Sequence, residues 1–385
     1  MQPKEDFLSS VSEKLTPVTD IDIKALSGIY DEKDVYLSVY LPVAGRENEH
    51  LNESFVDMRL ASIKKALPKE SRKQFEKTFS MAQSQILGKP ISGERGRIIF
   101  ASASGSFLHV YRFAVEPERS MVLDTSPFLL PLARLRADYE DYGLVLVDSR
   151  EARFFCIRSD NIEERKHLST DLMNKHKKGG WSQMRFNHLR KESIKAFLSE
   201  VADSMRDTCA QLDTKGLVIA GPGDAKQQLA DMLPDDIGKR VLGIIDTSMD
   251  IPRDRIVEAG DAIVYEEEHS RAKRRAEELR AEILKGGLAV QGVKTVRDAL
   301  ESGRVNVLLL LKGSSLPGWI CERCQNLQPS ARPPEECERC GGPTSEVDFM
   351  EELYELAQRT GAEVEFIEKE DMLEPDDLVG ALLRY

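Results

Sequence analysis

The residues most able to do chemistry lie in one short stretch, 175–186, which reads KHKKGGWSQMRF. Gly179 and Gly180 open backbone conformations closed to other residues and allow another molecule to approach closely. The lysines on either side of His176 favour a polyanionic partner. Gln183 can hold a water molecule through its uncharged amide. The alternative interpretation is an exposed, solvated loop without function.

The chain as a whole is acidic, with 385 residues and a formal net charge of −12, so it is not a general nucleic-acid binder. Only Glu192 opposes a local run of basic residues, which comprises Lys175, Lys177, Lys178, Arg185, Arg190, Lys191 and Lys195. A basic tip on an acidic chain is typical of a factor that touches RNA at one place.

The composition, 41% hydrophobic and 31% charged, is that of a soluble globular protein. No apolar run approaches the roughly 20 residues that span a bilayer. The N-terminus lacks the apolar region of a signal peptide. We therefore expect a cytoplasmic protein with no membrane partner.

Four of the six cysteines form two CxxC pairs separated by twelve residues, Cys321, Cys324, Cys337 and Cys340. In a cytosolic protein this spacing predicts a zinc ribbon with four thiolate ligands. Because such a site has no open coordination position, its Zn²⁺ would be structural. Iron in a rubredoxin-like site is the alternative. We expect Cys156 and Cys209 to be buried small hydrophobic residues.

The pattern of strands and helices predicts an α/β protein with three α/β domains. Residues 1–135 form the first, with strands at 35–41, 97–101 and 107–113 and helices at about 56–67 and 71–87. The alternation at 35–41 predicts a half-buried strand that stops at Pro42.

Residues 136–262 form the second domain, a mixed sheet with helices that carries the glycine loop. Its strands are expected at 144–147, 152–157, 217–220 and 241–245, and an amphipathic helix carries Ile194, Phe197 and Val201 on one face. Gly221-Pro222-Gly223 follows a strand. Lacking both common phosphate-binding patterns, it is read as a structural turn rather than a phosphate cradle.

Residues 263–385 form the third domain, into which the zinc ribbon is inserted at 317–345. A charged helix is expected at 266–284, a helix at 293–301 and a central apolar strand at 305–311. A helix at 347–359 capped by Gly361 and a strand at 362–367 follow. A short final helix is expected to end the chain.

In this context the glycine stretch resembles the central-domain motif of archaeal and eukaryotic class I peptide chain release factors, K-H-x-x-G-G-Q-S-x-x-R-F-x-x-x-R. The positions that match without a gap are Lys175, His176, Gly179, Gly180, Ser182, Arg185, Phe186 and Arg190. The strand and turn at 217–223 and the C-terminal region from about Ala262 also resemble that family, which extends the resemblance to roughly residues 130–385.

In that family the glycine loop enters the peptidyl-transferase centre of the large ribosomal subunit and helps water to attack the peptidyl-tRNA ester. The resemblance implies a ribosome-dependent hydrolase with rRNA and peptidyl-tRNA as partners, and a C-terminal domain that could bind another protein. Gln183 would position the water, and Gly179 and Gly180 would shape the tip. Contacts to RNA would come from Lys175, His176, Lys177, Lys178, Trp181, Arg185 and Arg190. The alternative role of Arg185, Phe186 and Arg190 is to anchor the loop.

Two departures from the family motifs refine this prediction. Trp181 occupies the position of the family's glutamine, and the spacing from Gly180 to Gln183 resembles hydrolases that release chains from stalled ribosomes. Residues 1–135 contain neither Asn-Ile-Lys-Ser nor Tyr-x-Cys-x-x-x-Phe, the decoding signatures. We therefore predict peptidyl-tRNA hydrolysis on stalled ribosomes without stop-codon decoding. The alternatives are a non-enzymatic ribosome-binding or hibernation factor and an ordinary stop-codon release factor.

Overall fold

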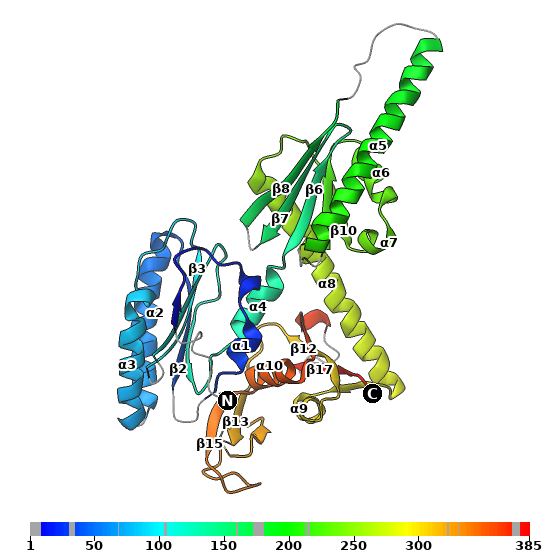
Figure 1. Ribbon diagram of the computed structural model, residues 1–385. Helices are drawn as coiled ribbons and strands as arrows, with labels where there is room; N and C mark the ends of the chain where they lie inside the picture. The colour runs from blue at the N-terminus through cyan, green and yellow to red at the C-terminus, as the bar shows by residue number, and fades with distance from the viewer. Residues whose placement is uncertain are drawn as a thin grey trace. The chain divides into compact units, whose positions relative to one another are not determined.

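The computed structural model describes residues 9–30, 35–67, 69–103, 106–158, 161–171, 181–211, 214, 216–321, 323–330, 332–371 and 378–385 (Figure 1). The chain divides into two compact units, one formed by Met1–Ala137 with His269–Tyr385 and the other by Asp138–Glu268. Strands and helices alternate in both, which confirms the predicted mixed α/β class. The division into three domains stays a prediction.

The N-terminal part of the first unit is built on a sheet with the order β1-β4-β3-β2-β5 in the described part of the chain. Its strands are β1 (Ser9–Val11), β2 (Tyr36–Pro42), β3 (Gly96–Ser102), β4 (Phe107–Phe113) and β5 (Ser120–Asp124). Helices α2 (Gly45–Ala66) and α3 (Lys69–Ile86) pack on one face through apolar side chains such as Val56 and Phe75. The short elements η2 (Val18–Asp20) and α1 (Ile23–Ser27) precede β2, and α4 (Leu130–Asp138) follows β5.

The prediction that the strand at 35–41 is half-buried is wrong, because every residue of β2 is buried. The helices cover one face, and the segment around Phe128 meets the other. The Tyr40 hydroxyl donates a hydrogen bond to the Phe128 carbonyl, and the Phe128 N–H donates one to the Ser38 hydroxyl.

A buried ionic cluster ties α3 to this sheet. The Glu94 carboxylate, with a fully buried side chain, lies 2.6 Å from Arg97 Nε and 2.8 Å from Arg112 Nη1. Arg97 also donates to the Gln85 and Gly88 carbonyls at the end of α3. Burial alone would raise the pKa of Glu94, but hydrogen bonds from these arginines and from the Ile91 N–H hold it below its usual value.

The C-terminal part of the first unit has a sheet with the order β11-β17-β12-β16 in the described residues. Its elements are β11 (Ala289–Gln291), α9 (Val293–Glu301), β12 (Val305–Leu311), α10 (Phe349–Thr360), β16 (Glu363–Ile367), η3 (Lys369–Asp371) and β17 (Val379–Leu383). The predicted central position of the apolar strand β12 is confirmed. The left-handed cap at Gly361, with φ of 68°, is also confirmed.

One prediction for this region is wrong, and another is confirmed except for its start. The chain ends in strand β17 rather than a helix, because Val379–Leu383 pairs antiparallel with both β11 and β12. The charged helix predicted at 266–284 is α8 (Arg253–Lys285), which begins earlier. Its residues Ala272, Ala276 and Leu279 pack on the C-terminal sheet.

Buried carboxylates of α10 hold the segment before α4. The Glu351 side chain accepts hydrogen bonds from the Leu129 and Leu130 N–H groups, at 2.5 and 2.7 Å, and so satisfies donors at the start of α4. Glu355 accepts one from the Ser126 hydroxyl at 3.2 Å. Burial raises the pKa of Glu355 to about 7, with Arg359 opposing the shift.

The second unit contains the sheet β10-β9-β6-β7-β8 in the described residues. Its strands are β6 (Tyr142–Val147), β7 (Glu151–Arg158), β8 (Asn161–Ser169), β9 (Gly216–Gly221) and β10 (Val241–Asp246). β10, β9 and β6 pair in parallel, and β6 and β7 form an antiparallel hairpin. One face is covered by α5 (Trp181–Gln211), α6 (Ala225–Met232) and α7 (Asp235–Gly238), and the other by the first part of α8. No helix in the described residues is both long and apolar enough to cross a membrane.

We expect Glu94→Ala to destabilise the protein by about 3–5 kcal/mol, because it leaves two buried arginines without their counter-charge. Glu116→Ala is the matched control, since Glu116 forms an exposed ion pair with Arg95, and such pairs contribute about 0–1 kcal/mol. Urea unfolding followed by circular dichroism measures both. Equal losses in the two variants would contradict the role of the cluster.

Stability should fall as pH rises from about 4.5 to about 7, because the folded protein keeps the Glu355 proton in this range while the unfolded chain loses it. The slope reaches at most about 1.4 kcal/mol per pH unit. In Glu355→Gln this part of the slope should disappear. Glu346→Gln, on the exposed side of β15 (Thr344–Asp348), controls for the loss of one carboxyl group. An unchanged slope in Glu355→Gln would show that another group causes it.

Candidate functional site

Helix α5 starts directly after the glycine pair, at Trp181, and continues to Gln211. Neither glycine nor proline interrupts this sequence, so the backbone can remain helical throughout. Gln183 is therefore the third residue of a helix, within its first turn.

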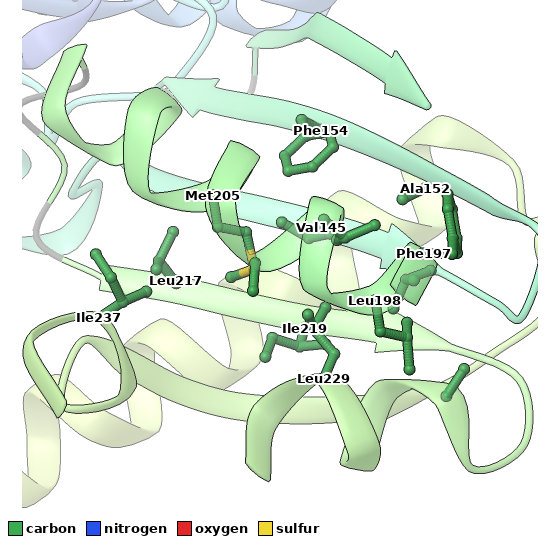
Figure 2. Close-up of a cluster of buried hydrophobic side chains, with 14 residues drawn as sticks. Val145, Ala152, Phe154, Phe197, Leu198, Met205, Leu217, Ile219, Leu229 and Ile237 are labelled. Carbon is green, nitrogen blue, oxygen red and sulfur yellow. The ribbon is translucent and has the colours of Figure 1, made fainter. Parts of the chain in front are cut away.

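The second half of α5 is anchored in a hydrophobic core (Figure 2). Phe197, Leu198 and Met205 of this helix pack with strand residues such as Val145 and Ile219. The amphipathic face predicted for the helix is confirmed. A hydrogen bond of 2.8 Å between Lys166 Nζ of β8 and the Ser204 hydroxyl adds a polar contact.

The first half of α5 has a different environment. Phe197 is the first buried residue among the described side chains of the helix, and every described side chain from Arg185 to Ser193 is exposed or partly exposed. Basic residues dominate this part, as the sequence indicates. His188 Nδ1 lies 3.3 Å from Glu192 Oε1, one turn further along.

The predicted tip residues are placed only in part. Arg185 is exposed and Arg190 partly exposed on α5. Trp181 and Gln183 belong to the helix backbone, and their side chains lie outside what the structure describes. Also outside the described residues are Lys175, His176, Lys177, Lys178, Gly179 and Gly180. Their roles stay predictions.

The Gly221-Pro222-Gly223 turn joins β9 to α6. A Cβ atom on Gly221, where φ is 152°, would lie 1.8 Å from the Val147 carbonyl oxygen of the neighbouring strand. Glycine is thus required at this position for strand packing. This geometry agrees with the interpretation of a structural turn.

The four cysteines of the CxxC pairs come together in a small module between β12 and α10. β13 (Pro317–Cys321) pairs with β14 (Leu327–Gln328) and β15, and the described cysteine sulfur atoms all lie within 4.8 Å of one another. Cys321 and Cys340 Sγ are 3.5 Å apart, and Cys324 and Cys337 Sγ are 3.8 Å apart. A tetrahedral ion with Zn–S bonds of about 2.3 Å requires S–S separations of about 3.8 Å. The residues therefore fit one tetrahedral metal ion.

Backbone groups around this cluster favour thiolate at one ligand. Burial raises the pKa of Cys337, but hydrogen bonds from the N–H groups of Arg339 and Cys340, together with those from the Cys321 and Cys324 side chains, lower it to about 6. Gly342 packs closely, because a Cβ there would lie 3.2 Å from Cys321 Sγ and 3.3 Å from Cys340 Sγ. Elsewhere, Cys156 is buried as predicted, and the side chain of Cys209 lies outside the described part.

Comparison with known proteins connects these features. Residues 127–264, which include all of α5, match the model of bacterial archaeo-eukaryotic release factor family 10. The peptide chain release factor subunit 1 of Methanosphaera stadtmanae is 27% identical over 98% of this chain and 99% of its own length. The chain is thus similar to class I release-factor-like proteins. The Methanopyrus kandleri protein of the same name is 26% identical over 78% of this release-factor-like chain and 76% of its own.

Solved structures include similar proteins at greater distance. A structure described as a model of ribosome-bound archaeal Pelota and ABCE1 covers 100% of this chain and 98% of its own, with 14% identity and a TM-score of 0.43. The Pelota of Archaeoglobus fulgidus covers 94% of this chain and 92% of its own, with 18% identity and a TM-score of 0.34.

The sequence pattern predicts a loop at the family motif and a helix only after it. In this release-factor-like chain the helix already includes Trp181 and Gln183. The signal was present in the sequence, since helix-compatible residues run without a break from position 181 into the predicted amphipathic face.

The metal site is tested by metal analysis of the purified protein. We expect one ion per chain, lost or strongly reduced in Cys337→Ser because one of four ligands is removed. Cys156→Ala is the matched control and should retain the ion, since Cys156 is a buried cysteine of a different unit. Metal content unaffected by Cys337→Ser would rule out the four-cysteine site.

Proposed function

We propose that this release-factor-like protein is a peptidyl-tRNA hydrolase that frees nascent chains from stalled ribosomes without reading a stop codon. The observation that carries the proposal is the family match over residues 127–264, which contains the glycine motif at the start of α5. The same match makes large-subunit rRNA and peptidyl-tRNA the proposed partners.

The proposed chemistry is hydrolysis of an ester. Water attacks the carbonyl carbon, the bond to the tRNA ribose oxygen breaks, and the proton passes to that leaving oxygen. Gln183 orients the water through its amide, which is a positioning role. A backbone N–H at the glycine pair can stabilise the oxyanion. Lys175, Lys177, Lys178, Arg185 and Arg190, with His176 and Trp181, supply the RNA contacts.

The absence of decoding signatures from residues 1–135 supports the rescue role over ordinary termination. The four-cysteine module is proposed to hold Zn²⁺, which would cross-link its two knuckles in a structural role. Cys321, Cys324, Cys337 and Cys340 are its ligands, as their sulfur separations allow.

The second candidate is a ribosome-binding factor on the same scaffold that does not hydrolyse peptidyl-tRNA. Trp181 at the family's glutamine position favours it. The two candidates share RNA binding and differ only in release, so one assay separates them.

The decisive measurement is release of labelled peptide from purified stalled ribosomes under single-turnover conditions. We expect release without a stop codon, and a loss of about 100-fold in Gln183→Ala, because the water loses its orientation. Gln228→Ala on the exposed side of α6 is the matched control and should release normally.

Equal and negligible release by wild type and Gln183→Ala, with binding retained, would establish the non-enzymatic factor instead. Release only at a stop codon would make the protein an ordinary termination factor.

A further inference from the structure

In the first half of α5, the described side chains, at Arg185 and from His188 to Ser193, are exposed or partly exposed, so none of them is buried in the core. The packed face begins at Ile194, which contacts the core only partly, and Phe197 is the first fully packed residue. Trp181–Ser193 therefore extends about 20 Å beyond the anchored half at 1.5 Å per residue. Gln183 lies about 21 Å along the axis from Phe197.

Local interactions favour helix over loop in this segment. His188 and Glu192 are spaced by one turn, with Nδ1 and Oε1 3.3 Å apart. The Ser193 hydroxyl donates to the Leu189 carbonyl at 2.9 Å. No glycine or proline lies between Trp181 and Phe197. The segment is therefore continuous with an anchored helix and does not have to nucleate alone.

We infer that Trp181–Ser193, the strut, is a rigid spacer whose length and stiffness fix where Gln183 stands during hydrolysis. The inference rests on the proposed function and adds a positioning element to it. A catalytic amide that orients water tolerates little displacement, since about 1 Å can cost about 100-fold in rate. A flexible connection of the same length would spread Gln183 over many positions.

The competing explanation is that the strut matters through side-chain contacts with RNA. Two variants distinguish these explanations. Both remove the same side chains of the strut, but one keeps the helix stiff and the other makes it flexible. His188, Leu189, Glu192 and Ser193 are suited to this because all four are exposed and none is among the proposed RNA contacts. Alanine at these positions keeps the helix, and glycine loosens it.

The experiment compares single-turnover release and ribosome binding for wild type, the fourfold alanine variant and the fourfold glycine variant. We expect the alanine variant to release within about threefold of wild type, and the glycine variant to lose about tenfold or more at unchanged binding. A third variant inserts four alanines after Lys191, which lengthens the helix by about 6 Å and turns its end by about 40°. It should also bind and fail to release.

Equal losses in the alanine and glycine variants would overturn the inference in favour of side-chain contacts. Normal release by the glycine variant or by the insertion variant would overturn it too. Wild-type protein that releases nothing would contradict the proposed function instead. Hydrogen exchange of the free protein then tests the rigidity of the strut independently of release. Amides at 185–193 that are protected about tenfold or more support a rigid strut, and unprotected amides overturn the inference.

Discussion

The apolar contact between the second half of α5 and the sheet β10-β9-β6-β7-β8 is the interaction on which the candidate site depends. Burial of a side chain such as Phe197 or Val201 contributes about 1.5–3 kcal/mol, whereas even a fully charged exposed pair one helical turn apart contributes about 0.3–0.5 kcal/mol. The helix is therefore held by one end. The position of the N-terminal end of α5 is set by the direction in which the core holds the helix. It also depends on the stiffness of the backbone between the core and that end.

Most elements with a strong local signal could be predicted from the sequence. The apolar run of β12, the glycine stop after α10 and the turn between β6 and β7 each depend on neighbouring residues. Two elements could not be predicted this way. β8 is a charged edge strand without an apolar alternation, and Val379–Leu383 carries residues that suit helix or strand equally. β8 is held by antiparallel pairing with the preceding strand β7, and β17 by pairing with β12, which lies far away in the sequence.

The distinction between features set by neighbouring residues and features set by tertiary contacts also applies to the cysteine cluster and to buried polar contacts. The cysteine quartet was predictable because two short knuckles dictate the ligand geometry. A bound metal would replace the core that so small a module cannot build. The hydrogen bond from the Leu129 N–H to the Glu351 carboxylate could not be predicted, because 222 residues separate donor and acceptor. A glutamate in a helical pattern is ordinarily placed on the exposed face. Here its carboxylate is buried because it satisfies backbone groups at the start of another helix.

The family motif has glutamine at the position of Trp181, whereas this chain has glutamine two positions later, at Gln183. Because α5 is helical from Trp181 onward, this shift has a geometric consequence. In an extended loop, a shift of two residues leaves a side chain on the same face of the chain. In a helix, positions 181 and 183 lie about 200° apart around the axis and about 3 Å apart along it. Trp181 and Gln183 therefore belong to nearly opposite sides of the helix. If Gln183 does the work that glutamine does in the decoding relatives, the helix must present the opposite side to the ester. Positions 181 and 183 are then not interchangeable in function.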